Sequence, residues 1–280
     1  MSRPDLEVAD IFRECGAQYR KIHGTSMSRE QHRAMRAIEI CRTATLGGHV
    51  DQCDQCGEQR ISYNSCRNRH CPKCQSLARA KWLEARMAEL LPTPYFHVVF
   101  TLPREIASVA FQNMKLVYTI LFRAVSQTLL DIAADPKHLG AEIGFLAVLH
   151  TWTQTLMHHP HLHCVIPGGG LSPDHTRWVS GRPKFFLPVV VLSSMFRGKF
   201  LFYLKQAFDQ GKLNFFGDLK PLADPQAFGH FLRRNREIEW VVYAKRPFGG
   251  PAQVLDYLGR YTHRIAISNN RLLAFKDGKV

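Results

Sequence analysis

Two Cys-x-x-Cys pairs lie close together in the first third of the 280-residue chain, and they constrain its folding more than any other feature. Cys53 and Cys56 form the first pair, and Cys71 and Cys74 form the second. This spacing is typical of a four-thiolate zinc site, in which one ion fixes two loops together. The alternative is a disulfide framework, but nothing in the sequence indicates an oxidising compartment. We therefore expect a zinc-stapled module built on these four cysteines.

Further candidate zinc ligands are interleaved with the two pairs. Cys41, His49, Cys66 and His70 would form a second set of two thiolates and two imidazoles. The alternative for the two cysteines is burial as small apolar side chains. The sequence therefore predicts one zinc ion and leaves a second one open.

The charge of the chain is strongly positive. It carries 37 Lys and Arg against 23 Asp and Glu, a formal net charge of +14. Seven of the basic residues, against two acidic ones, lie between Arg60 and Leu90. Such an imbalance favours a polyanionic partner, and a metal-stapled basic module suits the backbone of a nucleic acid. The alternative is a generic basic surface in contact with solvent.

The order of expected elements indicates two domains and an α+β fold. We expect residues 1–92 to form the small zinc module and residues 93–280 to form a mostly antiparallel sheet flanked by helices. Helices are predicted at 29–42 with Ser28 as cap, 75–91, 111–131, 187–210 and 251–262; strands are predicted at 95–102, 143–152, 161–166 and 239–244. The sequence shows no N-terminal signal peptide and no apolar run long enough for a bilayer, so we expect no membrane partner.

The predicted strand at 161–166 carries histidines at alternate positions. Alternation along a strand sends His161 and His163 to one face and the residues between and after them to a core. Two imidazoles on one face can hold a divalent metal ion, although half-buried histidines bonded to the backbone are the alternative. With His159, the segment also resembles the triple-histidine strand of histidine-triad nucleotide hydrolases.

Two tyrosines near the C-terminus complete the set of reactive side chains. Tyr257 and Tyr261 are four residues apart, so both phenols project from one face of a helix. A buried tyrosine stripe is the alternative, but ten Lys and Arg against four acidic residues lie between Arg233 and Val280. A phenolate can attack phosphorus, and the resulting ester conserves the energy of the broken phosphodiester.

Four segments, in family order, resemble the two-tyrosine insertion-sequence transposases of the HUH nuclease superfamily. The zinc-binding domain of that family is similar to residues 63–75, its first strand motif to 100–103, its metal motif to 159–164 and its catalytic helix to 257–264. The resemblance runs from about residue 15 to the last residue. It implies an HUH nuclease-like fold and a bacterial, cytoplasmic, nucleoid-associated transposase.

The resemblance also implies a mechanism and its residues. His161 and His163 would bind Mg²⁺ or Mn²⁺, with Gln154 as the third ligand and His159 as its rival. Tyr261 or Tyr257 would attack a phosphate of single-stranded DNA at a transposon end, leaving a 5′-phosphotyrosine and a free 3′-hydroxyl. The basic residues expected on DNA are Arg67, Arg69, Lys73, Arg260 and Arg264.

Two further hypotheses compete with the hypothesis that the chain is a nicking and rejoining enzyme. Relatives continue past the catalytic tyrosines, whereas this chain stops at Val280, so we expect a truncated copy. Such a copy could be an inactive remnant that binds transposon ends without cutting them. A histidine-triad hydrolase would explain neither the cysteines nor the tyrosine pair.

Overall fold

The chain forms two compact units. The computed structural model describes residues 6–153, 157–182, 187–245, 250, 252–253, 255–256, 259 and 267–280. The first unit comprises Met1–Ala85 together with His263–Val280, and the second comprises Arg86–Thr262. We expected a single boundary at residues 92 and 93. The C-terminal segment instead returns to the first unit, where the backbone N–H of Val8 donates to Oδ1 of Asn269 at 3.2 Å.

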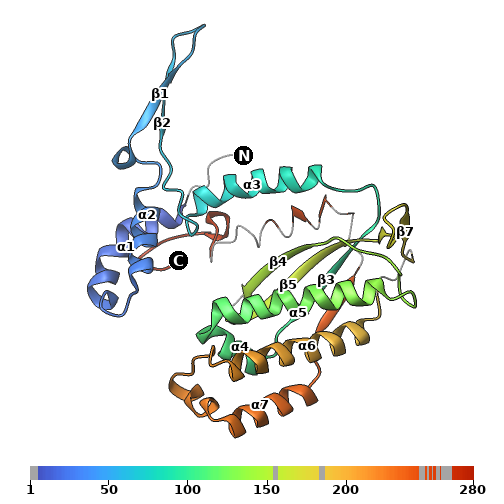
Figure 1. Cartoon of the computed structure of the whole chain (residues 1–280). Helices are drawn as coiled ribbons and strands as arrows, with labels where there is room; N and C mark the ends of the chain where they lie inside the picture. Colours follow the sequence, from blue (N-terminus) through green and yellow to red (C-terminus); the bar gives the residue numbers. More distant parts are fainter. Residues whose placement is uncertain are drawn as a thin grey trace. The chain divides into compact units, whose positions relative to one another are not determined.

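The first unit is mainly helical (Figure 1). Its elements are α1 (Val8–His23), α2 (Arg29–Ile40), η1 (Ala44–Leu46), β1 (Gly48–Gln52), β2 (Gln59–Tyr63), the first part of α3 (Pro72–Ala88) and η3 (Asn269–Arg271). The predicted start of α2 is confirmed, because Oγ of Ser28 accepts a hydrogen bond from the backbone N–H of Gln31 at 3.2 Å. The core of this unit contains Ala9, Ile38 and two cysteines.

Strands β1 and β2 form an antiparallel hairpin that projects from the helices of the first unit (Figure 1). All five residues of β1 and all but one of β2 are exposed. A two-stranded ribbon with no buried face is marginally stable by itself. Its stability must therefore come from its turn, its base or a bound partner.

The second unit is built around one antiparallel sheet with the strand order β4-β5-β3-β8. These strands are β3 (Tyr95–Thr101), β4 (Leu146–Trp152), β5 (His158–Pro167) and β8 (Val242–Lys245). A smaller hairpin consists of β6 (Gly169–Leu171) and β7 (Trp178–Ser180). The predicted α+β class with an antiparallel sheet is confirmed, and each of the four predicted strands is present in the sheet.

Helices cover one face of this sheet (Figure 1). They are α4 (Arg104–Gln112), α5 (Met114–Ala134) and α6 (Val189–Asp209), followed by η2 (Gly217–Ala223) and α7 (Pro225–Glu237). The ring of Phe196 meets the rings of Phe100 and Trp240 edge to face, and the centroid distance is 5.2 Å in each pair. Helix α5 is long and apolar enough to cross a membrane by length and composition alone, but half of that stretch is buried. Its buried face belongs to the core of this unit.

The pleat of the sheet separates an apolar face from a face rich in histidine. Leu162, Cys164 and Ile166 of β5 are fully buried in the core beneath the helices, which confirms the predicted alternation. The intervening residues of β5 therefore point to the opposite face. Histidines from three neighbouring strands meet on that face.

Candidate metal centres

His150, His161 and His163 form the first candidate metal centre. Their ligand atoms all lie within 4.8 Å of one another. In the β4–β5 register, His150 lies opposite His161, and the pairing shifts immediately afterwards. Such an irregularity often adjusts the direction of a side chain next to a functional site. His150 and His163 are each only 5% exposed, so the three imidazoles converge in a largely buried place.

A hydrogen bond to the backbone orients the ring of His161 with a nitrogen lone pair toward His150. Nδ1 of His161 donates to the carbonyl oxygen of His159 at 2.7 Å, which leaves Nε2 of the neutral ring as an acceptor. That Nε2 lies 3.0 Å from Nδ1 of His150. A backbone carbonyl that holds one ring nitrogen of a histidine is the usual arrangement behind a metal ligand.

His97 of β3 lies behind His163. The distance between Nε2 of His97 and Nδ1 of His163 is 2.9 Å, and the two rings stack at an interplanar angle of 13°. His97 was not among the residues predicted for the metal site. Its signal was its place in the predicted strand 95–102, in phase with the face that carries the metal motif.

Burial favours the uncharged form of two of these imidazoles, those of His163 and His97. Burial lowers the pKa of His163 to about 2, with smaller contributions from His161, His97 and His150. Burial also lowers the pKa of His97. Neutral imidazoles are the form that binds metal ions, so His163 can accept a cation at neutral pH without first losing a proton.

Several residues expected in the catalytic site lie outside the described residues. They are Gln154, Tyr257, Arg260, Tyr261 and Arg264. His159 is described; its backbone carbonyl accepts from Nδ1 of His161, and its ring lies 5.5 Å from the ring of His161, centroid to centroid. Among the described residues, the third imidazole beside the predicted pair belongs to His150, which the sequence analysis did not select.

Four cysteines of the first unit form the second candidate metal centre. Cys41, Cys66, Cys71 and Cys74 have sulfur atoms within 4.8 Å of one another. Sγ of Cys74 lies 3.6 Å from Sγ of both Cys41 and Cys66. Zn–S bonds of about 2.3 Å at tetrahedral angles put sulfur atoms about 3.8 Å apart, so the donors fit a zinc ion. The first turn of α3 follows Cys71, and a helix N-terminus favours thiolates there.

The protonation of these thiols reflects their crowding. A hydrogen bond from the Cys71 thiol is the largest cause that lowers the pKa of Cys41, to about 5. Burial raises the pKa of Cys66 to about 11, and the bond to Cys41 raises the pKa of Cys71. The cluster therefore favours one thiolate that its neighbours stabilise by donating protons. A zinc ion would replace those protons and allow the remaining thiols to ionise.

The expected grouping of the two Cys-x-x-Cys pairs differs from the grouping in the structure. Cys53 and Cys56 are exposed at the turn between β1 and β2, while Cys71 and Cys74 join Cys41 and Cys66. The hairpin separates the pairs, because its two five-residue strands carry its turn away from its base. At that turn, Gly57 has a φ of +69° and its N–H donates to the carbonyl oxygen of Cys53 at 2.9 Å.

The remaining predicted zinc ligands are also outside the cysteine cluster. Nε2 of His49 lies 3.6 Å from a carboxylate oxygen of Asp51 on the exposed hairpin. His70 is exposed, and partial burial is the main cause that lowers its pKa. The predicted second set of two thiolates and two imidazoles is therefore not assembled among the described residues.

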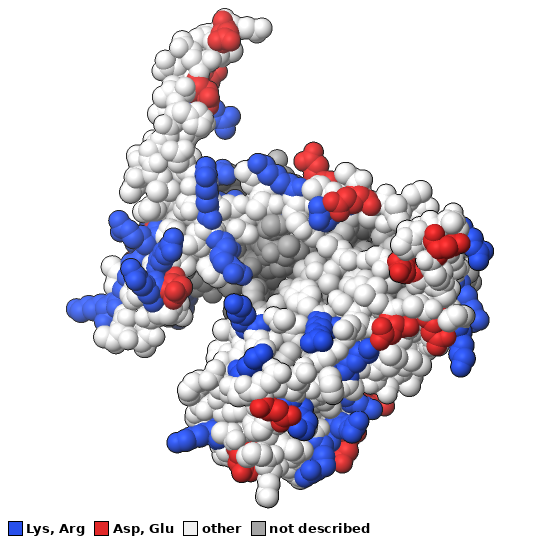
Figure 2. Space-filling view, viewed as in Figure 1, with Lys and Arg blue, Asp and Glu red and all other residues white. Residues whose placement is uncertain are grey.

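The basic residues of the zinc module differ in their surroundings. Arg67 and Arg69 are exposed, whereas Nζ of Lys73 lies 2.5 Å from Oε2 of Glu7. The side chains of that pair are only 14% and 5% exposed. Figure 2 shows Lys and Arg outnumbering Asp and Glu on the visible face of the helical part of the first unit. The two arginines are thus better placed than Lys73 to reach a phosphate.

Comparisons with known proteins identify both parts of the chain. Residues 144–280 match a family described as "Putative transposase", and residues 11–102 match a "Transposase zinc-binding domain". A "Putative transposase y4qJ" of Sinorhizobium fredii is 65% identical over 280 residues, covering 100% of this chain and 70% of that protein. The transposase for insertion sequence element IS801 of Pseudomonas savastanoi is 26% identical over 255 residues, covering 85% of this chain and 56% of that protein.

Among solved structures, the conjugative relaxase TrwC in complex with oriT DNA is similar to part of the chain. The metal-free form covers 60% of this chain and 72% of its own, with 12% identity and a TM-score of 0.31. A complex with mutant oriT DNA covers 92% and 95%, with the same identity and TM-score. The sequence identities and TM-scores of the relaxase structures are too low to support a conclusion about this chain. The 65% identity to the Sinorhizobium fredii transposase, over all 280 residues of this chain, shows the family. The chain belongs to the family of transposases that carry an N-terminal zinc-binding domain of the IS91 type.

Proposed function

We propose that this transposase nicks and rejoins single-stranded DNA at transposon ends through a metal-assisted 5′-phosphotyrosine intermediate. The observation that carries the proposal is the convergence of His150, His161 and His163 on one face of the sheet. In the sequence, Tyr257 and Tyr261 follow in a basic segment that supplies a nucleophile. A divalent ion bound by the three imidazoles would polarise the scissile phosphate.

The donor set favours Mn²⁺ over Mg²⁺ for this role. Imidazole nitrogen suits transition metals, whereas Mg²⁺ prefers carboxylate, carbonyl and water oxygen. His161 keeps Nε2 available because the carbonyl oxygen of His159 accepts its Nδ1–H. His163 keeps Nε2 available in the same way if Nε2 of His97 accepts its Nδ1–H, so we assign His97 as the positioning residue of His163.

In the proposed cleavage step, the phenol oxygen of Tyr257 or Tyr261 forms a bond to phosphorus. The phenol gives up its proton as this bond forms, the bond between phosphorus and the 3′-oxygen breaks, and that oxygen takes up a proton to become the free 3′-hydroxyl. Rejoining reverses the step, because a 3′-hydroxyl attacks the phosphotyrosine and releases the phenol. No ATP is needed, since the ester retains the energy of the phosphodiester. Arg260 and Arg264 would neutralise the phosphates beside the reacting one.

The zinc module would hold the DNA while the second unit acts on it. The four thiolates of Cys41, Cys66, Cys71 and Cys74 would bind one structural zinc ion. The exposed Arg67 and Arg69 lie in the segment that carries three of these ligands, so zinc would fix their positions. We expect this activity in the bacterial cytoplasm, where the DNA lies.

A covalent adduct tests the proposal. The protein is incubated with single-stranded oligonucleotides that carry the ends of the element, in Mn²⁺, and separated on a denaturing gel. We expect a protein–DNA adduct that disappears in the double variant Tyr257→Phe/Tyr261→Phe. Binding of the oligonucleotides without any adduct in the unsubstituted protein would favour the binding-only remnant instead.

A further inference from the structure

A cavity of about 520 Å³ lies in the second unit, on the sheet face that carries the histidine cluster. Its wall includes Tyr95 of β3, Leu146 of β4 and Val165 of β5. These residues are in phase with His97, His150 and His163 along the same three strands, so their side chains leave the sheet on the same side. The cavity and the proposed metal site therefore lie on the same side of the sheet.

The strand register gives the spacing between the cavity and the histidines. Leu146 pairs with Val165, and the next pair on that face is Val148 with His163. Two residues along an antiparallel strand span about 7 Å. One nucleotide step of an extended single strand covers a similar length, so a strand with one phosphate at the histidines places a neighbouring nucleotide over the cavity.

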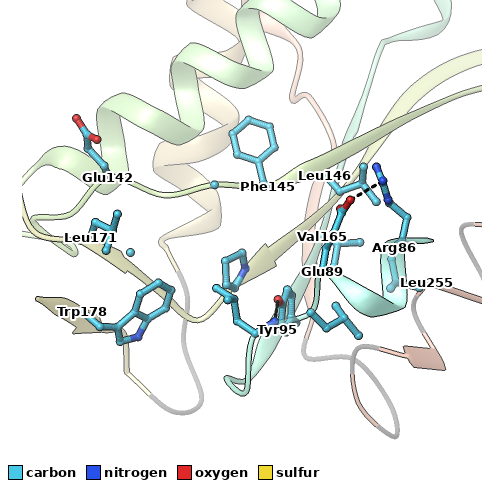
Figure 3. Close-up of a pocket in the computed structure, with 15 residues that line it drawn as sticks. Arg86, Glu89, Tyr95, Glu142, Phe145, Leu146, Val165, Leu171, Trp178 and Leu255 are labelled. Atoms are coloured by element: carbon cyan, nitrogen blue, oxygen red, sulfur yellow. Dashed lines mark hydrogen bonds and ion pairs between the residues drawn. The ribbon is translucent and has the colours of Figure 1, made fainter. Parts of the chain in front are cut away.

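The cavity offers aromatic and aliphatic surface beside a few charged side chains (Figure 3). Trp178 and Leu171 are 38% and 43% exposed, whereas the half-buried Phe145 packs against the hydrophobic core of the unit. The ring of Trp178 lies against β6, because a Cβ atom added at Gly169 would be 2.6 Å from its Nε1. This contact holds the indole in place as a stacking surface.

The polar side chains of the cavity are engaged by other groups of the protein, and Oε2 of the exposed Glu142 lies 2.8 Å from Nε2 of His175. The hydroxyl oxygen of Tyr95 accepts a hydrogen bond from the N–H of Leu91 at 2.9 Å. Arg86 pairs with Glu89 at 2.5 Å on one side of the cavity (Figure 3). These groups leave aromatic and aliphatic surface as the main recognition element, which suits stacking without strict base selection.

We propose that this cavity receives one unstacked nucleobase of the DNA strand, next to the phosphate held at the histidine cluster. The base stacks on Trp178, and the adjoining backbone runs along the sheet face toward His163. This inference rests on the proposed function, because it takes single-stranded DNA as the ligand. It adds a base-binding subsite that fixes the register of the strand before cleavage.

The test uses fluorescein-labelled dT20 and an abasic 20-mer of deoxyribose phosphate, each titrated with protein in Mn²⁺ while fluorescence anisotropy is recorded. We expect Trp178→Ala to weaken dT20 binding roughly 5- to 100-fold, the range for loss of one stacked base. The substitution does not change the affinity for the abasic strand. Trp178→Phe keeps an aromatic ring and retains most of the affinity for dT20.

Phe202→Ala is the matched control, since it removes a 63% exposed aromatic ring from α6, which packs on the other face of the sheet. Equal dT20 affinities for the unsubstituted protein and Trp178→Ala would overturn the cavity assignment alone. So would an equal loss of affinity for dT20 and for the abasic strand. Failure of the unsubstituted protein to bind dT20 would instead overturn the single-strand proposal, and this inference with it.

Discussion

Nε2 of His97 lies 2.9 Å from Nδ1 of His163, and the two rings are nearly parallel. Neither residue neighbours the other in sequence, and their contact exists because β3 and β5 are paired in the sheet. Through this contact, a residue outside the metal motif sets the direction of one of its imidazoles.

Replacing His97 should weaken metal binding without removing a ligand. We expect His97→Ala to lower the affinity for Mn²⁺ by about 10- to 100-fold, the usual effect of losing a partner behind a metal-ligating histidine. His97→Gln, whose amide can still reach the ring nitrogen, should recover part of the loss. Isothermal titration calorimetry measures both. His138→Ala removes an exposed imidazole and should leave the affinity unchanged; an unchanged affinity in His97→Ala would refute the positioning role.

The zinc content of cysteine variants distinguishes the two groupings of thiols. We expect Cys66→Ser to lose bound zinc and to destabilise the first unit, because Cys66 belongs to the buried cluster. The double variant Cys53→Ser/Cys56→Ser should keep zinc at that cluster, since both residues are exposed at the hairpin turn. Elemental analysis of the purified proteins gives zinc per chain. A double variant without zinc would show that the two Cys-x-x-Cys pairs share one ion after all.

Acid should destabilise the metal-free protein through His163. The folded-state pKa of about 2 lies below the unfolded value of about 6.5, so the unfolded chain binds the extra proton at intermediate pH. The stabilising contribution is complete above pH 6.5 and is lost as pH falls toward 2, at up to about 1.4 kcal/mol per pH unit. Urea unfolding at pH 7 and pH 5 measures it. His163→Gln should show a shallower loss, and equal slopes in both proteins would contradict the assignment.

The start of α7 offers a prediction about stability alone. Oδ2 of Asp224 accepts a hydrogen bond from the backbone N–H of Ala227 at 2.8 Å, and Pro225 occupies the first turn. Asp224→Ala should lower the free energy of unfolding by about 1 kcal/mol, the typical cost of losing such a cap. The matched control is Asp218→Ala, an exposed carboxylate upstream. If the two variants unfold at the same denaturant concentration, the cap contributes nothing measurable.

Local patterns predicted the four strands of the main sheet and the helices α2, α3, α5 and α6, but not how these elements come together. The predicted helix at 111–131 is divided in the structure, because α4 ends at Gln112 and α5 begins after Asn113. The amide of Asn113 is engaged with the carbonyl oxygens of Val109 and Asn214 at this break. The latter is a long-range contact that no local period reveals. The capped start of α7 did carry a local signal, Asp followed by Pro, which the sequence analysis did not use.

The ligands of a candidate site could be predicted from the sequence where they share one strand. Ligands that come together from different elements could not be predicted in this way. His161 and His163 follow from alternation alone. His150 required the register between two strands, and that register shifts just after it. The cysteine grouping required knowing that β1 and β2 form a hairpin, since spacing favours the nearest pairs without regard to the chain between them.

The most direct test of the histidine site is anomalous diffraction from crystals of the protein soaked in Mn²⁺. The account predicts one manganese peak bounded by ring nitrogens of His150, His161 and His163, with His97 behind His163 and not bound to the ion. A peak held by the side chain of His159 in place of His150, or no peak at the cluster, would contradict the proposed metal centre.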